Sequence, residues 1–544
     1  MDLKKITIGE KSMSFLENKT NYNLDDINTL IFEKAGIVNF FDQQDDCFRF
    51  KQSVSSSQKA VSDIRAKYGD FQTNKPLTLS ICHYLKSKNI NPISLIEPTC
   101  GKGSFIISAL QTFNSLQQIF GIEIQVEYLW HLKFEILEYF LTNPTAHKPK
   151  IYLYNNNIFD FDFMKIKKKL TYHELLIIGN PPWVTNSALS VLGSDNLPQK
   201  INFKNTNGID AITGKGNFDI GEYITLKILN IFSTHNGHFA FLIKNSVIKN
   251  IVFEQKNNQY RISNLEKHNI NAKKEFNAAV DASLFSCKLN TNPDLTAKEF
   301  DYYTLKYIAQ LGWHNGKFAS DIERHKKYEH LEGVCPYVWR QGIKHDCAKV
   351  MELERINGGF RNGLGEEFEL EEDLVYGVLK SSDLKGEVID KSRKYTIITQ
   401  KKLGQNTLFL LEKFPKTKEY LHRHKQLFLN RKSSIYKGKP MFSIFGIGDY
   451  SFKPFKIAIS GLYKQTKFTL IKPNEKSLLL DDTCYFIGFD DLEEAEEVHN
   501  FLNLQETQEF IKSFMFSDTK RVITKELLMR INISVSNSYK TTLF

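Results

Sequence analysis

The strongest chemical signal in the sequence is a four-residue loop, Asn180-Pro181-Pro182-Trp183, that follows directly on an apolar run. The two prolines end the preceding strand and stiffen the turn, so the side chains beside them are held in place. Asn180 offers an amide oxygen, Pro181 a backbone carbonyl and Trp183 a flat aromatic face. Two acceptors beside a ring suit a planar heterocycle with an exocyclic amino group, whereas the alternative is a structural turn capped by tryptophan.

A second polar cluster follows the apolar run 93–97. Glu97 ends this run, and Thr99, Gly101 and Gly103 come before the next amphipathic segment. Glycines at such a turn allow the backbone to approach a ligand closely. The turn lacks the third glycine of a dinucleotide fingerprint and the upstream glycine of a Walker loop. An acidic residue in this place suits a cationic ligand better than a pyrophosphate.

Glu123 stands near the end of the next apolar run, 20 residues after Gly103. A carboxylate at this spacing can accept hydrogen bonds from both hydroxyls of a ribose. Together with the glycine turn, Glu123 predicts a cofactor that contains a nucleoside.

These polar residues follow apolar runs that alternate with amphipathic segments. The pattern predicts βαβ units and therefore an α/β fold, a mostly parallel sheet with helices on both faces. Ligands of such sheets bind beyond the carboxyl ends of the strands, where the polar residues lie. The expected strands are 93–97, 120–124, 151–154, 175–178, 239–243 and 280–287, and the expected helices include 105–113 and 127–140.

The chain divides into three regions by pattern. Residues 1–60 are polar with weak helical periodicity and include a serine-rich linker at 53–57. Residues 61–300 carry the alternating strands and helices. From 301 to 544 the alternation stops, and glycines, short β-like runs and blocks of charge indicate a mixed α/β domain.

The composition is that of a globular protein. Its 544 residues correspond to two to four folding units at roughly 100–200 residues each. Aromatics at 13% supply a large core, which excludes disorder as the dominant state. No stretch approaches the ~20 apolar residues of a membrane span, and no signal-peptide pattern opens the chain. Seven scattered cysteines without a CxxC motif indicate free thiols in a reducing cytoplasm.

Positive charge is concentrated in one stretch. Lys and Arg exceed Asp and Glu by 10 over the whole chain, yet residues 413–476 alone hold 13 Lys and 2 Arg against three acidic residues. Aromatic residues are threaded through this basic stretch, and acidic blocks lie outside it at 366–373 and 481–497. The density of charge and rings favours a nucleic-acid surface over a solvated lysine face.

The Asn-Pro-Pro-aromatic loop with an upstream acidic glycine turn resembles the amino-group DNA methyltransferases, which methylate adenine with S-adenosylmethionine. The order of motifs is similar to the class in which a cofactor region and catalytic loop precede a C-terminal target recognition domain. Residues 68–73 resemble the family motif that closes over the methionine end of the cofactor, and 216–223 the motif after the catalytic loop. Phe276 with Val280 resembles the later motif whose aromatic stacks on the flipped base.

This resemblance implies a Rossmann-like methyltransferase domain at 61–300 and a mixed α/β target recognition domain at 301–544. Asn157 stands where the family often has an acidic residue that bonds the cofactor adenine, and an asparagine can substitute for it. The catalytic residues that the resemblance implies are Asn180, Pro181, Pro182, Trp183 and Phe276. The residues implied to bind S-adenosylmethionine are Thr73, Glu97, Thr99, Gly101, Gly103, Glu123, Asn157 and Ile158.

The implied partner is double-stranded DNA, with the target adenine rotated out of the helix. A cognate restriction endonuclease would act on the same site without a stable complex. The chain is expected to be a monomer without a membrane association, in the cytoplasm and near the nucleoid of a bacterium or archaeon.

Three other interpretations remain open. A protein-glutamine methyltransferase uses the same acceptors but needs no long basic C-terminal region. An RNA guanine methyltransferase is a further possibility. An inactive methylase-like subunit would need neither cluster intact. Cys100 lies in the glycine turn, away from the position that covalent cytosine chemistry needs. Six His and Cys residues between 314 and 347 match no recognised zinc spacing, so no metal is predicted.

Overall fold

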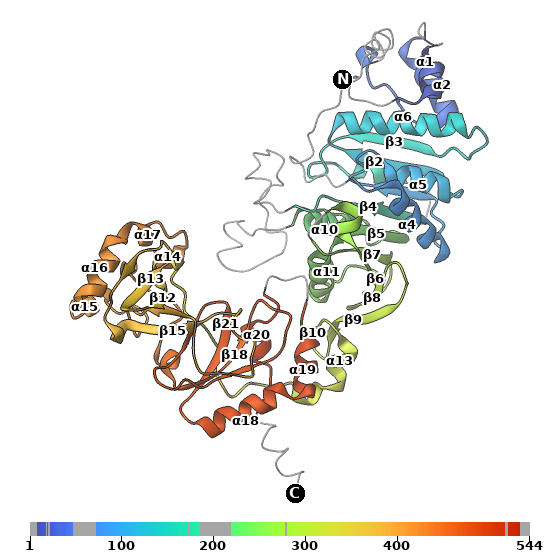
Figure 1. Ribbon diagram of the computed structural model, residues 1–544. Helices are drawn as coiled ribbons and strands as arrows, with labels where there is room; N and C mark the ends of the chain where they lie inside the picture. Colours follow the sequence, from blue (N-terminus) through green and yellow to red (C-terminus); the bar gives the residue numbers. More distant parts are fainter. Residues whose placement is uncertain are drawn as a thin grey trace. The chain divides into compact units, whose positions relative to one another are not determined.

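The computed structural model describes residues 8–17, 19, 22–46, 72–170, 174–184, 219–277, 280–516 and 521–533. The chain forms two compact units, Met1–Phe318 and Ala319–Phe544, which are drawn in Figure 1. The predicted serine-rich linker at 53–57 lies outside the described residues.

The first unit is built on a ten-stranded sheet with helices on both of its faces (Figure 1). Its helices are α1 (Glu10–Glu17), α2 (Leu24–Ala35), α4 (Lys75–Ser87), α5 (Ser104–Thr112), α6 (Val126–Thr142), α7 (Met164–Lys167), α10 (Ile220–Phe232), α11 (Asn245–Asn258) and α12 (Ala272–Phe276). Its strands are β1 (Ser94–Glu97), β2 (Gln118–Glu123), β3 (Lys150–Asn155), β4 (Leu175–Gly179), β5 (Gly237–Lys244), β6 (Ile262–Ile270), β7 (Ala282–Leu289), β8 (Thr296–Asp301), β9 (Tyr307–His314) and β10 (Lys317–Ala319).

The strand order is β10-β9-β8-β6-β7-β5-β4-β1-β2-β3. Strands β3, β2, β1, β4 and β5 run parallel, and β7 inserts antiparallel between β5 and β6. The chain winds from β1 outward to β3 and then returns to β4 on the other side of β1. This reversal is the switch point at which parallel α/β sheets bind their ligands. The predicted α/β sheet is confirmed, because the six expected strands correspond to β1–β5 and β7.

Two hydrophobic cores lie on opposite faces of this sheet. Leu95 of β1 packs in the core formed with α4, α5 and α6, whereas the next residue, Ile96, packs in the core formed with α10 and α11. Strands that are buried on both faces read as continuous apolar runs rather than alternating ones. This double burial explains why the central strands were evident in the sequence.

The N-terminal helices belong to the first unit. In this unit α1 and α2 pack against α6, and the Ser12 hydroxyl donates to Glu138 Oε2 at 2.7 Å. Lys133 of α6 is buried and donates from Nζ to the carbonyl of Phe40 at 2.7 Å. The described part of the predicted 1–60 extension is therefore anchored on the sheet domain.

The sheet continues beyond residue 300, where the sequence predicted a domain boundary. Strand β8 pairs in parallel with β6, and β9 pairs antiparallel with β8. These strands contain charged and polar residues, since β8 lies near the edge of the sheet and is only partly buried. The two units divide between Phe318 and Ala319, later than the predicted boundary.

The second unit has the mixed α/β character that the sequence predicted. Its two sheets have the orders β11-β21-β18-β19-β16 and β14-β13-β12-β17-β15-β20. The strands are β11 (Arg340–Gln341), β12 (Glu352–Ile356), β13 (Gly359–Asn362), β14 (Glu367–Phe368), β15 (Val375–Leu379), β16 (Val388–Ile389), β17 (Lys394–Ile397), β18 (Phe455–Ser460), β19 (Thr469–Ile471), β20 (Leu479–Leu480) and β21 (Cys484–Phe489). The helices are α13 (Ile322–Lys327), α14 (Ala348–Met351), α15 (Thr407–Leu411), α16 (Pro415–Arg423), α17 (Lys425–Leu429), α18 (Leu492–Asn503), α19 (Gln505–Lys512) and α20 (Lys525–Leu528). Short 3₁₀ turns include η2 (Glu329–Leu331), η3 (Glu372–Leu374), η4 (Ser434–Tyr436) and η5 (Asp449–Phe452).

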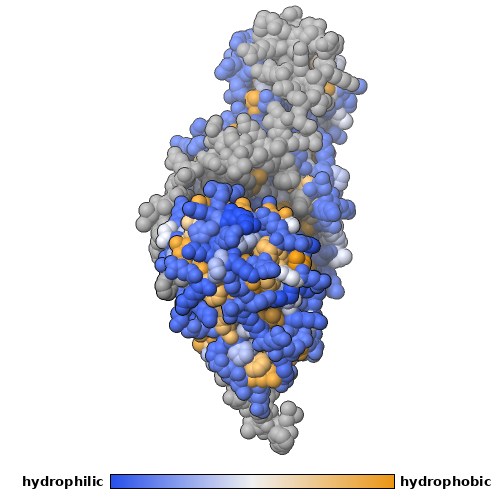
Figure 2. Space-filling view, turned by 60° about the vertical axis from the view of Figure 1, so that its left-hand side comes forward, coloured by the Kyte–Doolittle hydropathy of each residue, from blue (hydrophilic) through white to orange (hydrophobic). Residues whose placement is uncertain are grey.

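The face drawn in Figure 2 is mainly hydrophilic, with small apolar patches dispersed among polar residues. Such a surface suits a polar or charged partner better than an apolar one. In the described part of the chain, no helix combines the length and apolar character that a membrane crossing requires.

Candidate functional site

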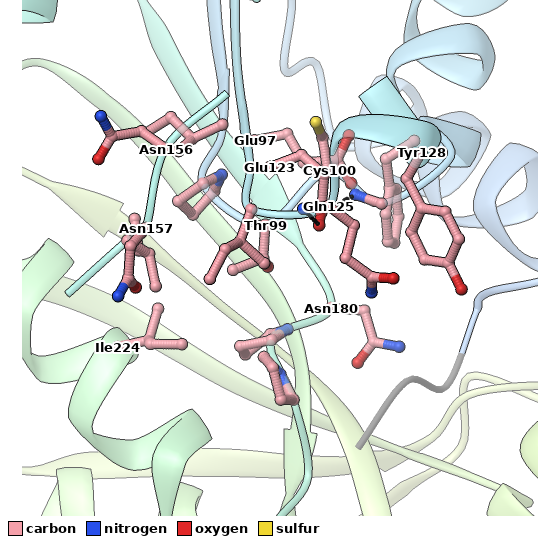
Figure 3. Close-up of a pocket in the computed structure, with 18 of the residues that line it drawn as sticks. Glu97, Thr99, Cys100, Glu123, Gln125, Tyr128, Asn156, Asn157, Asn180 and Ile224 are labelled. Atoms are coloured by element: carbon pink, nitrogen blue, oxygen red, sulfur yellow. Dashed lines mark hydrogen bonds between the residues drawn. The ribbon is translucent and has the colours of Figure 1, made fainter. Parts of the chain in front are cut away.

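A cavity opens at the carboxyl ends of β1, β2, β3 and β4, at the switch point of the sheet (Figure 3). It holds about 950 Å³ of empty space, part of which is open to solvent. The cavity brings together ten of the residues expected from the sequence: Thr73, Glu97, Thr99, Gly101, Glu123, Asn157, Ile158, Asn180, Pro181 and Pro182.

The glycine turn after β1 has two residues in the left-handed region, Gly101 with φ 53° and Gly103 with φ 80°. Gly101 lines the cavity, as expected. Gly103 does not line the cavity. A Cβ atom at this position would lie 2.0 Å from Cδ1 of Leu132 in α6. Gly103 therefore allows the turn to pack closely against α6.

Glu123 connects the ends of β1 and β2. Its Oε2 accepts a hydrogen bond from the backbone N–H of Gly101, and its Oε1 accepts one from Gln125, both at 2.8 Å. Each carboxylate oxygen has capacity for a further bond. These two bonds fix the Glu123 carboxylate in the lining of the cavity.

Glu97 is a buried ionisable group of the site. Burial raises the pKa of its carboxyl well above the ordinary value, and repulsion by the Glu123 carboxylate raises it further. Among the described residues none donates a hydrogen bond to Glu97 Oε2, and the same is true of the Thr99 hydroxyl. Since buried polar atoms are normally paired, both atoms call for a ligand in the cavity. A ligand with a cationic donor group fits them, and S-adenosylmethionine carries both an ammonium and a sulfonium charge.

The loop after β3 forms one end of the cavity, where Asn157 lies beside Ile224 of α10 (Figure 3). Asn157 Oδ1 accepts from the backbone N–H of Phe159 at 3.1 Å, which keeps the side chain close to its own loop. Lys227 of α10 donates from Nζ to the carbonyls of Ile158 and Phe159 at 3.0 and 2.6 Å. Burial lowers the pKa of Lys227, and these two bonds hold the loop in place.

The Asn-Pro-Pro loop lies across the cavity from the glycine turn. Asn180 is half-buried, and its Nδ2 donates to the hydroxyl of Thr73 at 3.1 Å. Beyond the loop, Val184 accepts from the backbone N–H of Ile220, the first residue of α10. Asp219 caps that helix and forms an ion pair with Lys244 at 2.6 Å. Asp219 comes from the predicted motif 216–223, of which 216–218 lie outside the described residues, as do 68–71 of the upstream motif.

Trp183 and Phe276 occupy a different place from the open stacking surface that the sequence suggested. Trp183 is only 5% exposed, and its indole N–H donates to the carbonyl of Leu242 at 3.1 Å. The ring of Phe276 meets it edge-on, with centroids 4.7 Å apart. Neither residue is among those that line the cavity. Trp183 belongs to the hydrophobic core on the α4–α6 face of the sheet, and Phe276 packs against this core.

Several lining residues were not predicted from the sequence. Gln125 and Tyr128 lie at the end of the cavity nearest Asn180, and Ile220 and Ile224 come from the helix after the catalytic loop (Figure 3). Gln125 follows a strand end by two residues, so the rule that placed Glu123 could have found it. The two isoleucines have the i, i+4 spacing of a helix face, but nothing in the sequence distinguishes this face from ordinary core.

The His and Cys residues at 314–347 do not converge. Within the described ranges no group of three or more His, Cys, Asp or Glu side chains is arranged to hold a metal ion. His325 contacts Glu332 at 3.2 Å, and Arg530 binds the same carboxylate through two hydrogen bonds. This part of the cluster stabilises the second unit.

The basic stretch 413–476 is distributed over several elements rather than one face. Three of its lysines pair with the acidic blocks outside it: Lys416 with Glu369, Lys453 with Asp490, and Lys472 with Glu496. Many of its aromatic residues are buried in the core of the second unit, namely Tyr420, Phe428, Tyr436, Phe442 and Phe468. The rings therefore contribute mainly to packing, and the net charge of the stretch overstates its exposed charge.

The parallel sheet, its switch point and the acidic glycine turn define the Rossmann-like fold of an S-adenosylmethionine-dependent methyltransferase. The chain is 39% identical over 483 residues to the type II methyltransferase M.NspV of Nostoc sp., covering 87% of this chain and 98% of that protein. It therefore belongs to the family of type II methyltransferases, and its cofactor is S-adenosylmethionine.

A solved structure supports the fold over nearly the whole length. The type IIL restriction-modification enzyme MmeI, in complex with DNA, superposes with a TM-score of 0.56 at 11% identity, covering 97% of this chain and 83% of that one. At this identity the similarity concerns the fold alone. No family model matches the chain.

Proposed function

We propose that the chain is a sequence-specific DNA methyltransferase of a restriction-modification system that modifies the exocyclic amino group of adenine. The single observation that carries the proposal is the cavity in which the Asn180–Pro182 loop faces the glycine turn at the ends of adjacent strands. Membership of the type II methyltransferases supports DNA as the substrate class. The second unit, Ala319–Phe544, is proposed as the target recognition domain.

The chemistry follows from the two acceptors of the loop. The lone pair of an adenine amino group is delocalised into the ring, which makes the nitrogen a poor nucleophile. Asn180 Oδ1 and the Pro181 carbonyl would each accept a hydrogen bond from the amino group. These two bonds would draw the nitrogen toward tetrahedral geometry. The same dipoles stabilise the positive charge that develops on this nitrogen. When bound, S-adenosylmethionine supplies a methyl group activated by the sulfonium.

The chain's other residues would align the partners. Glu97 and Thr99 have unmet hydrogen-bonding capacity toward the cofactor side, and Glu123 presents its carboxylate at the rim. Holding two reactants in line contributes several kcal/mol to an acceleration of this kind, roughly 7–11 in the best intramolecular cases. The base must leave the duplex to reach the cavity, at a cost of a few kcal/mol.

We further propose that Trp183 and Phe276 form the aromatic wall behind the flipped base. In this proposal the half-buried ring of Phe276 faces the base, and the buried ring of Trp183 supports it through their edge-on contact. Stacking on such rings is worth ~1–3 kcal/mol per base, which can offset the cost of extrusion.

The test is Asn180→Ala in the full chain. Methyl transfer to DNA should fall below detection, while the affinities for S-adenosylmethionine and for DNA stay within about threefold of wild type. Retained turnover by this variant would refute the assignment of the loop. Sequencing of DNA from a host that expresses the wild-type chain identifies the product, and methylated cytosine in place of N6-methyladenine would overturn the adenine assignment alone.

A further inference from the structure

The hydroxyl of Thr73 lies within hydrogen-bonding distance of the Asn180 side chain. Thr73 immediately precedes Asn74, the N-cap of α4, and is only 8% exposed. Its Oγ1 accepts from Nδ2 of Asn180 at 3.1 Å. The two residues are 107 positions apart in the chain, so this bond joins the segment before α4 to the catalytic loop.

The bond uses the donor end of the Asn180 amide. An asparagine side chain has two hydrogen-bonding ends, an NH₂ that donates and an oxygen that accepts. With Nδ2 donating to Thr73, the amide oxygen is the end oriented to accept a hydrogen bond from an amino group. An amide turned the other way would present hydrogens to that amino group and repel it. The mechanism therefore requires the orientation in which Thr73 holds this side chain.

The residue before Thr73 contacts the other wall of the cavity. Gln72 Oε1 accepts from the backbone N–H of Lys102 at 3.3 Å. The side chain of Gln72 also covers Gly101, since a Cβ atom there would lie 3.0 Å from its Nε2. Two consecutive residues thus reach the glycine turn and the catalytic loop, which otherwise come from different strands.

We propose that Thr73 is a positioning residue for Asn180, and that residues 72–73 connect the cofactor turn to the catalytic loop. This inference rests on the proposed role of Asn180. It differs from the expectation that Thr73 binds the cofactor, since its hydroxyl would contribute to the rate of methyl transfer rather than to affinity for S-adenosylmethionine. Thr73 orients the acceptor and does not itself touch the reacting nitrogen.

The experiment compares Thr73→Val with Thr73→Ser in the full chain. Valine has nearly the shape of threonine but cannot accept the hydrogen bond, whereas serine retains the hydroxyl. The measurements are the single-turnover rate of methyl transfer at saturating DNA and cofactor, and the dissociation constant for S-adenosylmethionine by calorimetry. The valine variant should lose about tenfold or more in rate, as expected for the removal of one hydrogen bond to a reacting group.

In the valine variant the cofactor affinity should stay within about threefold of wild type, and serine should restore the rate to within about threefold. A wild-type rate for Thr73→Val would overturn the inference, as would a loss confined to cofactor affinity. Asn180→Ala separates the two proposals. If that variant remains active, the proposed function fails, and if it is inactive while Thr73→Val is normal, only the role of Thr73 fails. Thr73→Ala replaces the valine variant if the latter does not fold, with the same expectations.

Discussion

The carboxylate of Glu97 should lower the stability of the cofactor-free protein while strengthening its affinity for the cofactor. The group is 2% exposed, lies near a second carboxylate at Glu123, and has an oxygen that no described residue satisfies. Replacing it by glutamine keeps the shape and removes the charge. We therefore expect Glu97→Gln to be more stable than wild type when no cofactor is bound, although it alters a residue of the site.

The magnitude follows from the charge that glutamine removes, because the amide still leaves a polar atom in the place of the unpaired oxygen. Each pH unit between the ordinary and the raised pKa costs the wild type about 1.4 kcal/mol of stability. Unfolding entropy is about 2.1 cal mol⁻¹ K⁻¹ per residue, so a cooperative unit of roughly 300 residues such as Met1–Phe318 has about 0.7 kcal mol⁻¹ K⁻¹. The melting temperature of the first unit should then rise by about 2 °C for each pH unit between the ordinary and the raised pKa. Affinity for S-adenosylmethionine should fall about 10–100-fold, because a hydrogen bond to a charged group contributes about 1.5–3 kcal/mol.

The sign of the pH dependence follows from the raised pKa of Glu97. Between the ordinary pKa of glutamate, about 4.3, and the raised value, the folded state holds a proton that the unfolded state has lost. Stability of the wild type that depends on this group is therefore present at low pH and is lost as the pH rises. The stability of Glu97→Gln relative to the wild type should therefore increase from about pH 5 toward neutrality.

Calorimetric melting of the cofactor-free protein across this pH range and titration with S-adenosylmethionine provide the two readouts. The matched control is Glu123→Gln, which should be less stable than wild type because Glu123 accepts the backbone N–H bonds of Gly101 and Gln125. If Glu97→Gln melted at or below the wild-type temperature at neutral pH, or bound the cofactor normally, the reasoning about this carboxylate would be wrong.

Two further predictions concern other parts of the chain. Lys227→Met should weaken S-adenosylmethionine binding about 3–10-fold, since the loop at Ile158 loses two hydrogen bonds, and an unchanged calorimetric affinity would contradict this role. Three exposed lysines have no ion-pair partner among the described residues, namely Lys432, Lys437 and Lys439. Their replacement by alanine should weaken DNA binding and reduce its salt dependence. The log–log slope should fall by about 0.9 for each phosphate that the variant no longer neutralises. The matched control replaces lysines of the same stretch that are already paired with carboxylates, namely Lys416, Lys453 and Lys472. An equal effect of both triple variants would exclude a specific role for the first set.

The sheet and most of the cavity were predictable because both follow from strong local rules. The central strands are buried on two faces and therefore appear as uninterrupted apolar runs, and ligands bind where such strands end. These two rules are enough to place Glu97, Glu123 and Asn180 in one cavity. Strand β8, near the edge of the sheet, escaped prediction because its partly exposed residues, Thr296–Asp301, lack an apolar run.

The positions that sequence reasoning placed less well are those whose role depends on a neighbour distant in the chain. Gly103 belongs to the glycine turn, yet its requirement comes from Leu132 of α6. Trp183 is an exposed platform by residue type, but the carbonyl of Leu242 and the ring of Phe276 bury it. Thr73 could be associated with the cofactor by its motif, while only the folded chain brings it to Asn180.

The charge of the second unit shows the same dependence on folding. Counted along the chain, residues 413–476 form the most basic stretch, and the acidic blocks at 366–373 and 481–497 are separate from it. In the folded unit, lysines of the stretch pair with carboxylates of both blocks, and Lys456 is buried with its pKa lowered to about 7 by desolvation. Only lysines that remain exposed and unpaired are free to release counterions from DNA phosphates, so the salt dependence of binding should follow their number and not the net charge of the stretch.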